Sequence, residues 1–160
     1  MHPPNSMKIT DHLTARDIIP ELRGESKEAV MAELVSVMTA HHSEVDAGEL
    51  LQVLQDRERL GSTGIGDGIA IPHGKMTGAT SLLMALGRKR QGIPFDAIDG
   101  RLVQLVFLLV APAGDSGIHL RMLARISRIL HDPAVRHLML EADDSSEALF
   151  SIMRQQDERP

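Results

Sequence analysis

The sequence predicts a layered α/β domain in which helices cover a mixed β-sheet. Apolar residues recur at helical spacing near both ends of the 160-residue chain, strand-like apolar runs occupy its middle, and helical segments also follow those runs. No internal repeat, linker or low-complexity segment interrupts the pattern, so we expect one compact domain. Its expected bounds are residues 8–155, between a disordered leader at 1–7 and a short tail at 156–160.

Two helices are expected before the first strand. Segment 27–41 carries apolar residues at helical spacing, namely Val30, Leu34 and Met38. Asp46 followed by Glu49 resembles a capping box, which opens a second helix. That helix runs toward Arg59, and Gly61 then stops it.

The middle of the chain has the character of a sheet. Ile69–Ile71 is short and apolar, Ser81–Leu86 is moderately apolar, and Leu102–Val110 is a strong run typical of a central strand. Pro112 and Gly114 close the last of these runs. Three strands are therefore expected.

Three helical segments follow the strands. The first extends from about Ser116 to Leu130. Asp132 and Pro133 have the residue types favoured at the cap and first position of a helix, and Ser145 caps a final one.

Composition narrows the class of protein. The chain has no cysteine, so disulfides and thiolate chemistry are excluded, and its net charge of −5 with no Trp or Tyr disfavours nucleic-acid binding. It contains no apolar run long enough to span a bilayer and no signal-like start, so we expect a soluble cytoplasmic protein with no membrane insertion. The motifs of zinc enzymes and serine hydrolases are also missing, and we expect neither a metal nor a cofactor.

Residues 61–75, GSTGIGDGIAIPHGK, form a glycine-rich segment. It matches neither the Walker pattern nor the dinucleotide-binding pattern. Its backbone N–H groups, with the hydroxyls of Ser62 and Thr63, have the composition of an anion-binding loop, although composition alone favours a plain tight connection.

His73 is the candidate nucleophile. It follows the short apolar run, Pro72 fixes the backbone before it, and Gly74 and Lys75 supply space and positive charge after it. A neutral imidazole with one nitrogen held by a hydrogen bond is a competent nucleophile toward phosphorus. A structural histidine is the alternative.

Two further residues are candidates for the same site. His119 opens the helix after the strong strand, so it shares one rim with His73 if their two strands are parallel. Arg57 lies in the last helical turn before the glycine-rich segment, where a guanidinium is suited to hold a phosphoryl group. Each also has a purely structural explanation. His119 can simply occupy the first turn of a helix, and Arg57 can complement the dipole at the end of its helix.

RERLGSTGIGDGIAIPHGK, residues 57–75, resembles the active-histidine signature of the mannitol/fructose type of enzyme IIA in the bacterial phosphoenolpyruvate:sugar phosphotransferase system. The resemblance continues through IPFDAIDGRLVQLVFLLVAPAGDSGIHLRMLARISRIL, residues 93–130, and covers roughly residues 8–155. The phrases GSTGIG, GIAIPHGK and FDAIDG are most similar to the nitrogen-regulatory branch of that family. The fold that the resemblance implies is a single α/β/α sandwich around a mixed sheet.

The resemblance also implies a mechanism. His73 accepts a phosphoryl group from a small HPr-like carrier, and His119 and Arg57 stabilise that group without metal or nucleotide. We expect phosphate binding at Ser62, Thr63 and Gly64, and partner contacts at Ile65, Gly74 and Lys75.

Two classes of function follow. A regulatory phosphocarrier changes its protein partners when it is phosphorylated, and the nitrogen-branch resemblance implies potassium transporters or sensor kinases as targets. The alternative is a sugar-transport component that passes phosphate to a cysteine of an enzyme IIB. A binding module that has kept the fold without the chemistry is a third reading.

Overall fold

The computed structural model describes residues 6–115 and 117–159. The chain begins with two short 3-10 helices, η1 (Ile9–Asp11) and η2 (Ala15–Asp17). The described helices are α1 (Lys27–His41), α2 (Ala47–Arg59), α3 (Ile118–Leu130), α4 (Pro133–Glu141) and α5 (Ser146–Asp157). The described strands are β1 (Ile18–Ile19), β2 (Gly64–Gly66), β3 (Ile69–Ala70), β4 (His73–Met76), β5 (Leu83–Ile93) and β6 (Val103–Pro112).

The six strands of the described chain form one mixed sheet in the order β1-β5-β6-β3-β2, with β4 also paired to β6. β5 and β6 are antiparallel, whereas β3 and β4 both run parallel to β6. Ile69 lies opposite Leu105, and His73 lies opposite Leu109 further along the same strand. The segment from β3 to β4 therefore follows β6 toward its carboxyl end.

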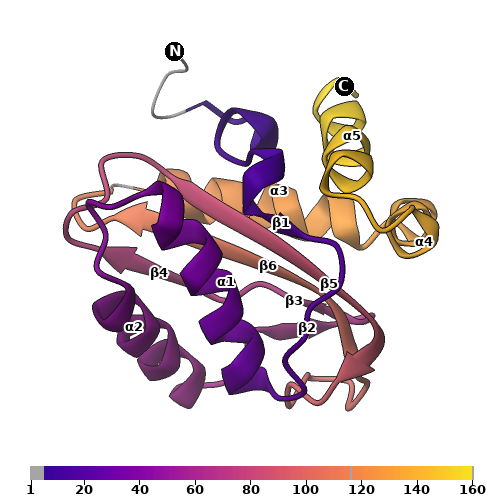
Figure 1. The fold of residues 1–160 in the computed structure, drawn as a ribbon, viewed down its shortest axis with the longest axis horizontal. Helices are drawn as coiled ribbons and strands as arrows, with labels where there is room; N and C mark the ends of the chain where they lie inside the picture. The colour runs from indigo at the N-terminus through magenta and orange to yellow at the C-terminus, as the bar shows by residue number, and fades with distance from the viewer. Residues whose placement is uncertain (1–5, 116, 160) are drawn as a thin grey trace.

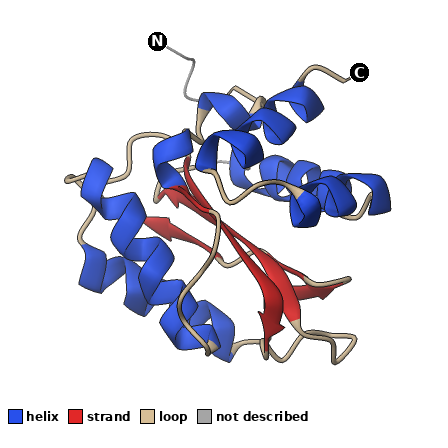
Figure 2. Cartoon of the chain, turned by 45° about the vertical axis from the view of Figure 1, so that its right-hand side comes forward, coloured by secondary structure: helices blue, strands red, loops and turns tan. Residues whose placement is uncertain are grey.

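Helices cover both faces of this sheet. Helices α1 and α2 lie on one face and α3, α4 and α5 on the other (Figure 1), and the sheet is seen between the two helical layers in Figure 2. Strand β6 serves both layers: Val106, Val110 and their neighbour Leu108 pack toward α1 and α2, while Phe107 and Leu109 pack toward α3 and α5. Burial on both faces explains the continuous apolar run of β6. The predicted α/β/α sandwich with a mixed sheet is confirmed.

Side-chain caps set the helix starts where the sequence predicts them. Asp46 accepts a hydrogen bond of 2.8 Å from the backbone N–H of Glu49, and α2 runs from there to Arg59. Asp132 and Ser145 cap α4 and α5 in the same way. Helix α3 begins at Ile118, and its expected start at Ser116 lies outside the described residues.

The strands differ more from expectation. β5 continues to Ile93, well past the expected end at Leu86, because it stays paired with β6, with Arg88 opposite Leu105 and Ile93 opposite Val103. The polar Arg88 fits this buried strand because it donates to the carbonyl oxygens of Met139 and Ala142 at the end of α4. β1, β2 and β4 were not expected, because strands of two to four residues leave no measurable periodicity.

The expected domain bounds of 8 and 155 stay a prediction, and contacts of the described chain extend beyond both. Helix α5 continues to Asp157, two residues past the expected boundary at 155, and the Asp157 carboxylate accepts hydrogen bonds of 2.8 Å from the backbone N–H groups of Ile9 and Thr10. Met7, placed in the expected leader, packs against the core, while residues 1–5 lie outside the described part. None of the helices in the described chain has the length and apolar character needed to cross a membrane.

Candidate functional site

A cavity of about 400 Å³ opens where α2, β4 and α3 meet. Its lining residues are Arg57, Ser62, Thr63, Ile65, Ile71, His73, Leu120, Leu123, Ala124 and Ser127. Because β4 is parallel to β6, His73 lies opposite Leu109 near the carboxyl end of β6, from which the chain leads into α3. The topology thus brings three of the predicted residues, His73, Arg57 and His119, to one end of the sheet.

His73 is half-buried and begins strand β4, rather than following the end of a longer strand. Its Nδ1 lies 2.8 Å from the carbonyl oxygen of Ile71. A carbonyl oxygen only accepts hydrogen bonds, so Nδ1 carries the proton and Nε2 keeps its lone pair. Burial is the main cause that lowers the pKa of His73, and the charges of Arg57 and His119 lower it further. The hydrogen bond to the Ile71 carbonyl and the charge of Glu58 act in the opposite direction, but the pKa stays below its ordinary value. The ring is therefore kept in its neutral, nucleophilic form.

His119 lies in the first turn of α3 and is held by Asp115, a residue that the sequence analysis did not identify. The Nδ1 of His119 is 2.6 Å from Oδ2 of Asp115, whose side chain is 5% exposed. Burial raises the pKa of Asp115, but hydrogen bonds from the His119 side chain and from the N–H groups of His119 and Gly117 outweigh it and leave the pKa lowered. Asp115 is therefore ionised at neutral pH.

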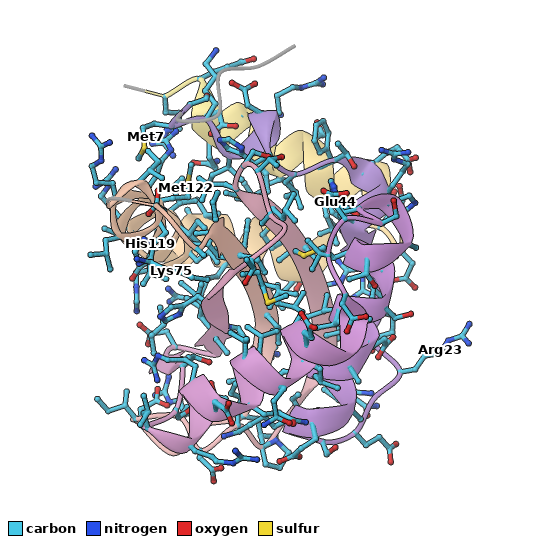
Figure 3. All side chains as sticks on the ribbon, turned by 90° about the vertical axis from the view of Figure 1, so that its left-hand side faces the viewer. Met7, Arg23, Glu44, Lys75, His119 and Met122 are labelled. Atoms are coloured by element: carbon cyan, nitrogen blue, oxygen red, sulfur yellow. The ribbon has the colours of Figure 1, made fainter. Side chains whose placement is uncertain are left out.

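Lys75 contacts the same loop, because its ammonium group donates to the backbone carbonyl of Asp115 at 3.2 Å. Figure 3 shows Lys75 and His119 next to each other on this side of the molecule. Lys75 is exposed and its charge lies beside the His119–Asp115 pair.

Arg57 lines the cavity from the last turn of α2. Its Nη1 donates to the carbonyl oxygen of Gly61 at 2.9 Å, which ties the guanidinium to the start of the glycine-rich segment. Arg59 is 2.5 Å from Asp56 on the exposed side of the same helix. Arg59 is not among the residues that line the cavity, as expected for a residue two helical positions away from Arg57.

The glycine-rich segment is fixed by bonds within the chain. The Ser62 hydroxyl donates to the Phe95 carbonyl at 2.6 Å and accepts from the Gly64 N–H at 2.9 Å. The N–H and hydroxyl of Thr63 both donate to Oε1 of Glu58. These donors shape the wall of the cavity, and the expectation that Ser62, Thr63 and Gly64 bind phosphate stays a prediction.

Glu58 is the second residue that the sequence analysis missed. Its side chain is only 7% exposed, and its other oxygen pairs with Lys27 at 2.9 Å. The pair ties the start of α1 to the end of α2, next to the segment that carries Thr63. Glu58 lies next to Arg57 at the end of a helix rich in charged residues, so nothing in the sequence indicates that its side chain is buried.

The residues expected to contact partners have different surroundings. Ile65 is half-buried and lines the cavity beside Leu120, which is 60% exposed. A Cβ on Gly74 would lie 2.7 Å from Cγ1 of Val53, so this glycine allows α2 to pack closely on β4.

In the described residues no group of three or more His, Asp or Glu side chains is arranged to hold a metal ion.

Comparisons with known proteins agree with this geometry. A family model described as "Phosphoenolpyruvate-dependent sugar phosphotransferase system, EIIA 2" matches residues 11–155. The nitrogen regulatory protein of Bradyrhizobium diazoefficiens is 37% identical over 147 residues, which are 92% of this chain and 95% of the relative. The fructose-specific EIIABC component of Bacillus subtilis is 36% identical over 151 residues, 94% of this chain but only 24% of that longer protein.

Solved structures give the same result. The nitrogen regulatory protein IIA-Ntr from Neisseria meningitidis superposes with a TM-score of 0.84 at 30% identity, covering 91% of this chain and 98% of that one. IIA mannitol from Escherichia coli shares the fold, with a TM-score of 0.73 at 20% identity over 88% of this chain and 98% of that one. The chain belongs to the EIIA type 2 family of the phosphoenolpyruvate-dependent sugar phosphotransferase system.

Proposed function

We propose that this chain is a phosphocarrier whose His73 accepts a phosphoryl group from the phosphohistidine of a small HPr-like protein. The hydrogen bond of His73 Nδ1 to the Ile71 carbonyl carries the proposal. It leaves Nε2 as the nitrogen with a free lone pair, on a residue that lines an open cavity. The lowered pKa of His73 supports the same role, because only the neutral ring attacks phosphorus.

The transfer is balanced without water or metal. The lone pair of Nε2 forms the new N–P bond while the bond between phosphorus and the donor ring breaks, and that electron pair returns to the donor nitrogen. The Nδ1 proton stays on His73, hydrogen-bonded to Ile71. Such a reaction depends mainly on positioning and on stabilising the charge of the phosphoryl oxygens, which is the role we assign to Arg57 and His119.

We further infer that phosphorylation regulates which proteins dock on this face. A phosphoryl group adds about −1.5 to −2 charge at neutral pH, here beside the exposed apolar side chain of Leu120. The nitrogen regulatory relative matches over nearly its whole length, which favours a regulatory role toward nitrogen or potassium systems, with a transporter or a sensor kinase as target.

Sugar transport is the second candidate, supported by the fructose-specific relative. A solved complex of Escherichia coli enzyme IIA mannitol with phosphorylated enzyme IIB mannitol shows the type of assembly that this alternative requires. In that case the phosphoryl group of His73 passes to a cysteine of an enzyme IIB.

The test is transfer of labelled phosphate from phosphoenolpyruvate through enzyme I and an HPr-type carrier. We expect acid-labile, alkali-stable label on the wild type, none on His73→Ala, and slower labelling of His119→Ala and Arg57→Ala. His137→Ala, which removes an exposed histidine of α4, is the matched control. A wild type that takes no label from either a sugar-branch or a nitrogen-branch carrier refutes the proposal. Equal binding of both phosphorylation states to every regulatory partner refutes the regulatory role alone.

A further inference from the structure

We propose that Asp115 is a positioning residue that makes His119 a cationic hydrogen-bond donor to the phosphoryl group. The inference rests on the proposed function, since it concerns the same transfer to His73. It begins from a difference between the two histidines. Both have Nδ1 in a hydrogen bond, but the partner of His73 is a neutral carbonyl and the partner of His119 is a carboxylate.

The proton positions follow from the two partners. The carboxylate of Asp115 accepts hydrogen bonds only, so the Nδ1 of His119 carries a proton. A neutral His119 in this arrangement directs a lone pair from Nε2, which repels phosphoryl oxygens. His119 donates from Nε2 only as an imidazolium, and the ionised carboxylate 2.6 Å away stabilises that cation.

The carbonyl that holds His73 has the opposite effect. It fixes the orientation of the ring without adding a negative charge, so the ring remains a neutral nucleophile. The same kind of side chain thus takes two roles in one site, and the group behind Nδ1 selects the role.

Asp115 is itself held firmly enough to act on His119. Its Oδ2 accepts from the N–H of Gly117 at 3.1 Å and from the N–H of His119 at 3.2 Å, as well as from the His119 ring. Its backbone carbonyl accepts from Lys75. With 5% of its side chain exposed, the carboxylate exchanges little of this bonding for water.

Two substitutions separate orientation from charge. Asp115→Asn keeps an oxygen that accepts from Nδ1 but removes the negative charge, whereas Asp115→Ala removes both. Asp132→Asn, which neutralises another aspartate at a helix start, is the matched control. We expect labelling of His73 to slow about 10- to 100-fold in both Asp115 variants, the range found when the carboxylate behind a metal-ligating histidine is lost, and to stay unchanged in the control.

Two readouts distinguish this role from a purely structural one. Ring ¹⁵N NMR is expected to show His119 protonated at both ring nitrogens in the wild type, at Nδ1 alone in Asp115→Asn, and released from the Nδ1 tautomer in Asp115→Ala. In a His119→Ala background, Asp115→Asn is expected to have no further effect, because Asp115 acts through His119. A wild-type labelling rate in Asp115→Asn overturns the inference, as does an additive effect in the His119→Ala background. Failure of the proposed function looks different, because the wild type then takes no label at all.

Discussion

Removing the carboxylate of Glu58 is expected to weaken the fold and the site together. Glu58 is 7% exposed and pairs with Lys27 at 2.9 Å, while its other oxygen accepts the N–H of Thr63 at 2.8 Å. Removing one member of a buried ion pair leaves the other charge without its partner and costs about 3–5 kcal/mol. This pair is only part-buried, and Lys27 keeps a contact of 3.1 Å with the exposed Asp96, so we expect Glu58→Ala to lower the free energy of unfolding by at most about 3 kcal/mol, the lower end of that range.

Urea unfolding followed by circular dichroism measures this loss, with the exposed Glu25→Ala as control. A double-mutant cycle with Lys27→Met is expected to give a coupling of about 1–2 kcal/mol. Labelling of His73 is also expected to slow, because Thr63 forms part of the cavity wall. A loss below about 1 kcal/mol, or a coupling near zero, refutes the reasoning, since the pair would then behave as an ordinary exposed ion pair.

Three further predictions concern packing, a buried charge and pH. Gly74→Ala is expected to destabilise the protein by about 1–3 kcal/mol, because the new Cβ would lie 2.7 Å from Val53 Cγ1, and Val53→Ala is expected to restore part of the loss in urea unfolding. Arg88→Met is expected to cost more than about 3 kcal/mol in the same assay, because it leaves buried carbonyls without donors. The control Arg128→Met, at an exposed position of α3, is expected to change little, and equal effects of the two would contradict this. The folded-state pKa of His73 lies below its ordinary value of 6.5, so its contribution to stability is present above about pH 6.5 and is lost as the pH falls below it. The difference in unfolding free energy between wild type and His73→Gln is therefore expected to decrease from pH 7 to pH 5, and a pH-independent difference would contradict it.

The helices were more predictable than the strands, for a physical reason. A cap such as Asp46 or Ser145 is a local contact between residues three positions apart, so the sequence contains both partners. The second half of β5 pairs with β6 and contains the buried Arg88, which donates to carbonyl oxygens more than fifty residues further along the chain. The local periodicity of a sequence carries no information about contacts between residues so far apart.

The candidate site was predicted through the three residues proposed to carry the reaction and not through the residues that hold them. Arg57, His73 and His119 belong to a recognisable pattern, and the topology places all three at one end of the sheet. Glu58 and Asp115 are common surface residue types whose burial depends on contacts with other elements. The hydroxyl of Ser62 donates to the backbone of the loop before β6, a contact that the sequence did not indicate, and its expected role toward phosphate stays a prediction.

The nature of these supporting contacts determines where the site is sensitive to substitution. The Nδ1 of His73 and the Nη1 of Arg57 are held by backbone carbonyls, of Ile71 and Gly61, which no side-chain substitution removes. The tautomer of His73, the proposed nucleophile, is therefore robust to side-chain substitution. His119 and the glycine-rich segment depend instead on two side-chain carboxylates, Asp115 and Glu58. Substitutions that disable transfer while sparing the three reactive residues should consequently concentrate at these two acidic positions. Loss at Glu58 should lower stability and rate together, whereas Asp115→Asn should lower the rate with little loss of stability.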